Sequence, residues 1–216
     1  MKVKVCGIQR LLDVMMVDNV GADLVGFINI QRSKRYADLR LINLLLSRME
    51  DFKKAVLVIE PDNIDEVIKK SKITGIKKIQ LHSLNSDEIH ILQKSHDLSI
   101  TRVVGISETI SPEKKKEIEA FSKVCDNLMF DYELNGQSGG TGRQIPLETA
   151  IKGAKIAKKT NSIDVFLAGG VNSGLMKRNR DKINQNFQGI DVNSGVEESP
   201  GIKDRTKLEE FMKILR

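Results

Sequence analysis

The segment Leu128-Met129-Phe130-Asp131 is a short apolar run that ends in a carboxylate, and the glycine-rich turn Gly139-Gly140-Thr141-Gly142 follows it. Near the start of the chain, Val3-Lys4-Val5-Cys6-Gly7 has the same form but ends in a thiol. Short apolar runs bounded by glycine are typical of strands buried on both faces. A carboxylate and a thiol at the ends of two strands could serve as acid and base on one substrate.

Similar apolar, β-branched runs recur along the chain, with helical stretches between them. Their spacing averages roughly 25 residues, which is enough for a strand, a helix and two loops. Eight strand–helix units in 216 residues favour a closed parallel barrel of the α/β class. The expected strands are Val3–Cys6, Leu24–Ile28, Ala55–Ile59, Lys78–Leu81, Ile100–Ile106, Leu128–Asp131, Val165–Ala168 and Ile190–Val192.

An open doubly wound sheet is the alternative architecture, because it also alternates strands and helices. A dinucleotide fingerprint after the first strand would favour it, but Cys6-Gly7-Ile8-Gln9 is not one. The chain has no linker or low-complexity tract, so we expect residues 1–216 to form one barrel domain.

Helix start signals stand between the expected strands. Ser111 can cap a helix that has Pro112 at its first position. Asn63, or a neighbouring aspartate, can open the third helix, and Ser86-Asp87-Glu88 the fourth. The last helix is expected to begin around Asp204-Arg205-Thr206.

The net charge of +6 raises the question of nucleic-acid binding. The lysines are interleaved with acidic residues, as in the segment 111–117. Aromatic residues make up only 4% of the chain, with no Trp, so a platform for stacking bases is hard to build. We therefore expect a solvated charged surface and no nucleic-acid partner, and an anionic substrate would also benefit from this charge.

The sequence also suggests a compartment. No apolar run approaches the roughly 18 to 20 residues of a membrane span, so no membrane partner is expected. The N-terminus runs straight into a strand, which argues against a signal peptide. Cys6 and Cys125 form neither a disulfide framework nor a zinc-like spacing, so we expect no metal and a reducing cytoplasm.

Active sites of parallel barrels form at the carboxyl ends of the strands, where Cys6 and Asp131 are expected. A buried cysteine often only packs, and a carboxylate at a strand end can simply cap a loop. Nearby positive charge could lower the pKa of the thiol into the range of a useful base. Asp126 and Cys125 precede their strand and should lie at the opposite end of the barrel.

Glycine turns follow the last three expected strands. Without side chains, backbone N–H groups can approach a phosphate, although a glycine can also merely turn the chain. Barrel enzymes often hold phosphate at the last pair of strands. The expected phosphate contacts are Gly140, Thr141, Gly142, Gly169, Gly170, Ser194 and Gly195, with Asp191 at the end of the eighth strand as a further substrate contact.

Two further polar side chains stand after strands. Arg35 could bind a substrate carboxylate through its planar guanidinium, or could be one more exposed cation in a basic loop. His82 is more simply a structural histidine than the base, and could support the site by a hydrogen bond.

In their order along the chain, these motifs resemble the phosphoribosylanthranilate isomerase family of tryptophan biosynthesis. The resemblance covers nearly the whole chain, and the ordered combination is specific. The segments that carry it are Lys4–Ile8, Gly21–Phe27, Ser33–Tyr36, Ile79–His82, Phe130-Asp131, Gly139–Gly142, Phe166–Gly170, Gly189–Glu197 and Ser199–Asp204.

The resemblance implies a (β/α)8 TIM barrel of the ribulose-phosphate-binding type. It implies isomerisation of N-(5-phosphoribosyl)anthranilate to 1-(2-carboxyphenylamino)-1-deoxyribulose 5-phosphate by an Amadori rearrangement. Cys6 then matches the family's general base, Asp131 its general acid, and Arg35 the arginine that holds the anthranilate carboxylate. No cofactor is implied, because the substrate nitrogen itself withdraws electrons once protonated.

The chain departs from the family pattern at Gln9, Ser83, Glu60, Asn193 and the polar stretch Lys177–Asn186. None of these removes the acid, the base or the phosphate turns. The alternatives are another phosphate-binding barrel, such as a ribulose-phosphate epimerase or a histidine-pathway isomerase, and a non-catalytic barrel that binds nucleic acid. No helix face is apolar enough to indicate a subunit interface, so the sequence is compatible with both a monomer and a homodimer.

Overall fold

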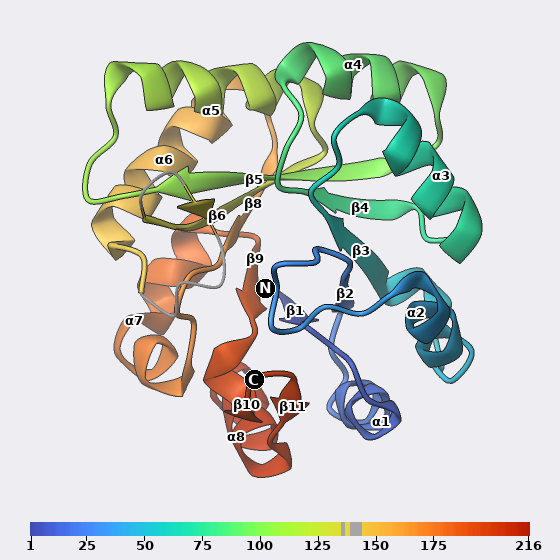
Figure 1. Cartoon of the computed structure of the whole chain (residues 1–216). Helices are drawn as coiled ribbons and strands as arrows, with labels where there is room; N and C mark the ends of the chain where they lie inside the picture. Colours follow the sequence, from blue (N-terminus) through green and yellow to red (C-terminus); the bar gives the residue numbers. More distant parts are fainter. Residues whose placement is uncertain (135–136, 139–143) are drawn as a thin grey trace.

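The computed structural model describes residues 1–134, 137–138 and 144–216. In this part of the chain, eight parallel strands close into a barrel, and helices surround them (Figure 1). The barrel strands are β1 (Lys2–Cys6), β2 (Leu24–Ile28), β3 (Ala55–Ile59), β4 (Lys78–Leu81), β5 (Ser99–Ile106), β6 (Asn127–Leu134), β8 (Asp164–Leu167) and β9 (Gly189–Val192).

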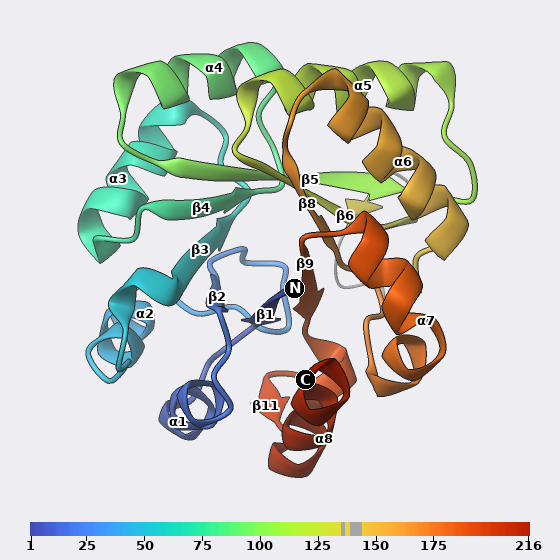
Figure 2. The same cartoon turned by 180° about the vertical axis from the view of Figure 1, so that it is seen from behind.

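The barrel closes because each strand pairs in parallel with two others. The strands follow one another in the order β5-β4-β3-β2-β1-β9-β8-β6, and β5 pairs with β6 to complete the ring. This closure confirms the predicted barrel and excludes the open sheet. The two chain ends lie close together in both the front and back views (Figure 1, Figure 2).

The observed strands match the expected ones to within a residue or two, except at the end of β6. This strand continues past Asp131 to Leu134 and then pairs with the short antiparallel strand β7 (Gln137–Ser138). Tyr132 is paired with Ile106 of β5, so the neighbouring strand supports the extension.

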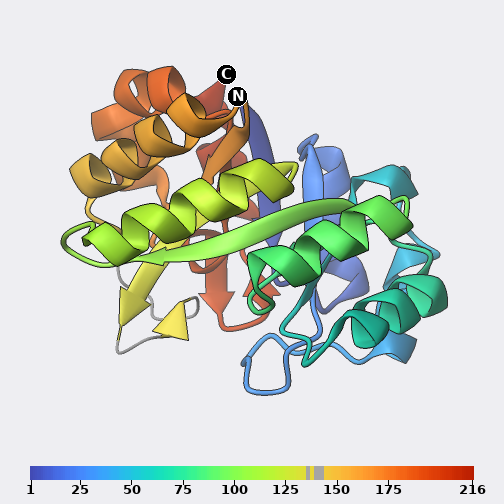
Figure 3. The same ribbon diagram turned by 90° about the horizontal axis from the view of Figure 1, so that it is seen from above.

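The helices connect successive strands on the outside of the barrel. In the view from above, α4 and α5 lie along the outer side of β5 (Figure 3). The helices are α1 (Leu11–Asn19), α2 (Leu39–Leu46), α3 (Ile64–Thr74), α4 (Ser86–Ser95), α5 (Pro112–Val124), α6 (Leu147–Thr160), α7 (Ser173–Asn186) and α8 (Arg205–Leu215), with single turns η1 (Phe52–Lys54) and η2 (Ser194–Val196).

Side chains cap these helices much as the sequence indicates. Ser111 accepts a hydrogen bond from the backbone N–H of Lys114, with Pro112 at the first helical position. Asn63 and Asp204 cap α3 and α8 in the same way. The polar stretch Lys177–Asn186 forms most of α7, which buries Ile183 against the barrel.

Successive side chains along each strand point to opposite faces of the sheet, so the strands contribute to two separate apolar regions. Val5, Phe27 and Leu57 are fully buried in the large core between the barrel and the helices. The intervening positions point into the barrel, where Cys6 packs with a small cluster that includes Ile28. Cys6 therefore faces the inside of the barrel and not the helices.

Within the described residues, no helix is long and apolar enough to cross a membrane.

Candidate active site

Cys6, Asp131 and Asp191 lie at the same mouth of the barrel, because all three stand at the carboxyl ends of parallel strands. Cys6 ends β1, Asp191 lies near the end of the adjacent β9, and Asp131 lies on β6 beyond β8. The negative charge of Asp191 raises the pKa of Asp131 and also that of Cys6. The structure thus places Cys6 and Asp131 at the same mouth of the barrel, and their roles as base and acid stay predictions.

The Cys6 thiol is buried, with 3% of the residue exposed. Burial raises its pKa above the ordinary value of a thiol, since it disfavours the charged thiolate. The neighbouring Lys4 ammonium opposes this effect, and Lys203 does so more weakly. Positive charge does lie beside the thiol, as the sequence analysis anticipated, but the cost of burial outweighs it.

The pKa of the Asp131 carboxyl lies close to neutral pH. Burial raises its pKa to about 7, although the backbone N–H of Tyr132, which donates to Oδ1 at 2.7 Å, favours the ionised form. The charge of Asp191 raises the pKa further. A carboxyl with this pKa can donate a proton near neutral pH, as a general acid must.

Lys4 is a central residue of the site that the sequence analysis did not single out. Its Nζ donates to Asp191 Oδ1 at 2.9 Å, and its side chain is 2% exposed. The available signal was a lysine two residues before Cys6 in an otherwise apolar strand, which places both side chains on the same face. That face is the inside of the barrel.

Arg35 is part of a buried ionic cluster in the loop after β2. Its Nη2 donates to Glu197 Oε2 at 2.6 Å and its Nε to Glu197 Oε1 at 2.9 Å. Lys203 Nζ donates to the same carboxylate and to Asn193 Oδ1. Glu197 belongs to β10 (Glu197–Ser199) and Lys203 to β11 (Ile202–Lys203), a small hairpin after the barrel. Arg35 is therefore a fixed cation and not a freely exposed one.

The glycine turns after β8 and β9 meet at the same mouth. Gly169 and Gly170 have positive φ angles of 75° and 70°. A methyl group on Gly195 would lie 2.2 Å from the carbonyl oxygen of Val171, so only glycine lets these two loops pack. Ser194 begins the single turn η2, directly after β9. The predicted contacts Gly140, Thr141 and Gly142 lie outside the described residues.

The departures from the family pattern have local structural roles. Gln9 Nε2 donates to the carbonyl of Tyr36 at 2.7 Å and joins the first two loops. Ser83 donates to the carbonyl of Pro61, and Glu60 pairs with Arg32. His82 is partly buried, and removal of its ring from water lowers its pKa to about 3, so it is neutral and fits a supporting role.

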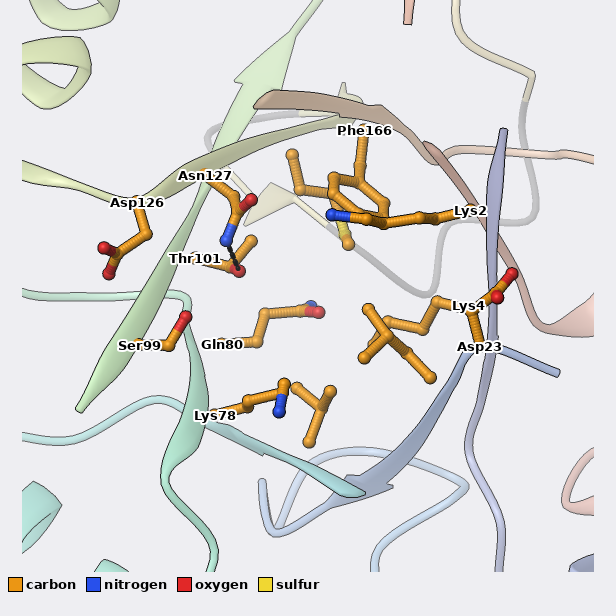
Figure 4. Close-up of a pocket in the computed structure, with 13 residues that line it drawn as sticks. Lys2, Lys4, Asp23, Lys78, Gln80, Ser99, Thr101, Asp126, Asn127 and Phe166 are labelled. Carbon is orange, nitrogen blue, oxygen red and sulfur yellow. Dashed lines mark hydrogen bonds between the residues drawn. The ribbon is translucent and has the colours of Figure 1, made fainter. Parts of the chain in front are cut away.

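The opposite mouth of the barrel contains a cavity of about 450 Å³ (Figure 4). Lys2, Gln80 and Phe166 point toward it, and Thr101 accepts a hydrogen bond from Asn127 at its edge. Asp126 also lines it, so the prediction that this residue lies far from Asp131 is confirmed. Neither Cys6 nor Asp131 borders this cavity.

Comparisons with known proteins address the identity of the chain. The family model of N-(5'phosphoribosyl)anthranilate (PRA) isomerase matches residues 3–214. The isomerase of Methanothermobacter thermautotrophicus is 33% identical over 99% of this chain and 88% of the relative.

Solved structures share the fold. The isomerase of Thermus thermophilus superposes with a TM-score of 0.81 at 22% identity, over 100% of this chain and 98% of that one. Another isomerase was solved in complex with reduced 1-(o-carboxyphenylamino)-1-deoxyribulose 5-phosphate. It superposes with a TM-score of 0.78 at 21% identity, over 100% of this chain and 98% of that one. A third structure, with a TM-score of 0.77 and 21% identity over the same shares of the two chains, is of monomers generated from the dimeric isomerase of Thermotoga maritima. Because the family model matches almost the whole chain, this protein belongs to the N-(5'phosphoribosyl)anthranilate isomerase family.

Proposed function

We propose that the protein isomerises N-(5-phosphoribosyl)anthranilate to 1-(2-carboxyphenylamino)-1-deoxyribulose 5-phosphate, with Asp131 as general acid and Cys6 as general base. The reaction is that of its family and belongs to tryptophan biosynthesis. The observation that carries the residue roles is a carboxyl with a pKa of about 7 at the same barrel mouth as a buried thiol.

The first step needs an acid. Protonated Asp131 donates to the ribose ring oxygen, the bond between C1 and that oxygen breaks, and the nitrogen lone pair forms a C1=N iminium ion. A carboxyl of ordinary pKa, about 3.9, would be ionised near neutral pH and could not donate. Burial of Asp131 therefore supports this role.

The second step needs a base. The Cys6 thiolate removes the proton from C2, and the electron pair moves toward the iminium nitrogen to give an enolamine. Loss of the hydroxyl proton at C2 and protonation of C1 then give the ketone. Protons and electrons balance within the substrate and the two side chains, so no redox partner is needed.

The two ends of the substrate carry negative charge. Arg35, held by Glu197, supports binding of the anthranilate carboxylate, and the glycines at 169, 170 and 195 support binding of the phosphate. Asp191 and Ser194 stand beside these loops. Gly140, Thr141 and Gly142 remain part of the proposal as phosphate contacts from the loop after β6.

The setting of the enzyme is also a proposal. Cys6 and Cys125 are free thiols, which suits a reducing cytoplasm. The family's phosphorylated small-molecule substrate is the expected partner, with no nucleic acid. The chain is a monomer or a homodimer, and the dimeric relative supports the second arrangement. Light scattering of the purified protein would decide between them.

Turnover of freshly generated phosphoribosylanthranilate, followed by loss of its fluorescence, tests the proposal. We expect turnover by the wild-type chain, and a fall on the order of 10²- to 10⁴-fold in both Cys6→Ser and Asp131→Asn. Cys125→Ser and Asp126→Asn are matched controls, because both residues lie at the other end of the barrel, and they should retain turnover. Undiminished turnover in Cys6→Ser or Asp131→Asn would remove that residue from the mechanism.

A further inference from the structure

Lys4 places a charged group in the middle of the barrel. It lies on the interior face of β1, two residues before Cys6, and its side chain is almost completely buried. The only acidic partner of its ammonium among the described residues is Asp191, on the neighbouring strand β9. The ion pair is therefore held by two adjacent strands.

The same ammonium lies beside the Cys6 thiol. Its positive charge favours the thiolate of Cys6, and the two groups act on each other's pKa. Gly26 on β2 makes this close approach possible: a methyl group there would lie 2.7 Å from Cys6 Sγ and 3.0 Å from Lys4 Nζ. Because glycine leaves this point empty, the sulfur and the nitrogen can remain neighbours.

Stability alone does not explain this arrangement. Removing two charges from water costs several kcal/mol per ion, and a well-packed apolar pair of similar volume is often as stable or more so. The presence of a lysine and an aspartate in the barrel interior therefore needs an explanation other than stability. The position of the ammonium beside the sulfur gives one, because a cation at this point favours the charged form of the thiol.

Building on the proposed function, we propose that Lys4 is a positioning residue whose ammonium, fixed by Asp191, stabilises the thiolate of Cys6 and so determines how readily the base becomes available. Lys4 does not exchange a proton in this role. It remains an ammonium throughout, because Asp191 and Cys6 raise its pKa and together outweigh burial, which acts in the opposite direction.

Three other charged groups face Cys6. Asp191 opposes the thiolate, whereas Lys203 on β11 and Arg35 after β2 favour it. Both of these cations hydrogen-bond Glu197, whose negative charge offsets theirs. Among these charges Lys4 acts most strongly on the Cys6 pKa, so its removal should have the larger effect on the thiol.

The decisive experiment is a pH titration of the Cys6 thiol in the free protein, followed by thiolate absorbance and by the rate of alkylation. Lys4→Met preserves the length of the side chain and removes the charge. We expect the Cys6 pKa to rise by about one unit or more, which lowers the thiolate fraction about tenfold below that pKa. Cys125 does not interfere, because burial raises its pKa to about 12.

Lys2→Met is the matched control. Lys2 lies on the same strand and pairs with the exposed Asp164, so its removal should leave the Cys6 pKa unchanged. A second comparison covers the case in which Lys4→Met leaves Asp191 uncompensated and the protein folds poorly. Asp191→Asn alone should lower the thiol pKa, and adding Lys4→Met to it should raise the pKa again.

Enzyme kinetics supply a second measurement. If Lys4 acts through the thiol, Lys4→Met lowers kcat/KM near neutral pH. It also moves the alkaline limb of the pH profile to higher pH, by as much as the Cys6 pKa rises. A purely structural role would lower activity without moving that limb. An unchanged Cys6 pKa in Lys4→Met overturns the inference. Absence of turnover in the wild-type chain would instead overturn the proposed function, because the titration uses no substrate.

Discussion

At the scale of single residues, burial gives Asp131 and Cys6 their chemical character. Desolvation raises the pKa of Asp131 to about 7 and also raises that of Cys6, so both groups favour their neutral forms in the free protein. The proposed acid, Asp131, is therefore able to donate near neutral pH, while the proposed base, Cys6, is ionised in only a fraction of molecules. Lys4 and Asp191 lie beside both groups and act on both pKa values.

The pH dependence of activity follows from these shifts. In the proposed mechanism the reactive form has Asp131 protonated and Cys6 ionised, and Asp131 loses its proton at a lower pH than Cys6. We expect kcat/KM to rise with pH up to about 7, to stay level, and to fall above the raised pKa of Cys6. A profile measured on the wild-type enzyme checks this.

Cys125→Ser should give the same profile, since Cys125 takes no part in the reaction. Activity that already declines from pH 5 to 7 would contradict the assignment of a proton donor with a raised pKa to this site.

At the scale of elements, the loops after β8 and β9 build one end of the site together. Gly195 in η2 packs against Val171 in the preceding loop so closely that no side chain fits between them. The positive φ angles of Gly169 and Gly170 turn the chain at the same point. Close approach of two backbones, and not any one side chain, thus shapes the proposed phosphate site.

Gly195→Ala tests this arrangement. The added methyl group must push the two loops apart, so we expect KM for the substrate to rise about tenfold or more, with weaker inhibition by inorganic phosphate. Steady-state kinetics with phosphate as a competing anion measures both.

Ser111→Ala is a useful comparison for the Gly195 variant, because it removes a helix cap in a different loop, after β5, and should cost about 0.5–2 kcal/mol of stability with KM unchanged. An unaltered KM and unaltered phosphate inhibition in Gly195→Ala would rule out this loop as a phosphate contact.

At the scale of the whole molecule, different side chains line the two mouths of the barrel. The proposed chemistry lies at the carboxyl ends of the strands, whereas the cavity at the amino ends is lined partly by apolar groups such as Phe166 and Met129. Phe166 is buried, and its ring occupies the space that a side chain on Gly189 would need. Barrels commonly separate stability from function in this way.

Phe166→Ala should therefore weaken the fold without changing the chemistry. We expect a loss of about 3–5 kcal/mol in the free energy of unfolding, from lost burial and the space left behind. Urea denaturation measures the stability, and kcat per folded molecule should stay close to the wild-type value. A large fall in kcat with normal stability would show that this mouth takes part in the reaction.

Much of the fold could be predicted because its signals are local. Apolar runs close to Gly, Asn, Asp or Pro placed all eight barrel strands, and Ser111 and Asp204 placed helix starts. The extension of β6 to Leu134 was missed, since it depends on pairing with β7. The expectation that residues 1–216 form one domain stays a prediction, which limited proteolysis would test.

The candidate site could be predicted only in part. Cys6 and Asp131 could be placed at one mouth because parallel strands in a barrel share their carboxyl ends. The contacts of Lys4 with Asp191 and of Arg35 with Glu197 could not, since 187 and 162 residues separate the partners along the chain. Nothing in a local pattern says which distant carboxylate will meet which cation.

The amino-acid sequence by itself determined the barrel, the identity of the acid and base candidates and the mouth at which they stand, because strand periodicity and chain order are properties of neighbouring residues. Only the tertiary structure decided that the carboxyl of Asp131 has a pKa of about 7 and that a buried ammonium lies against the thiol of Cys6. Desolvation and charge pairing depend on which side chains surround a group in space, and strands far apart in the sequence supply them.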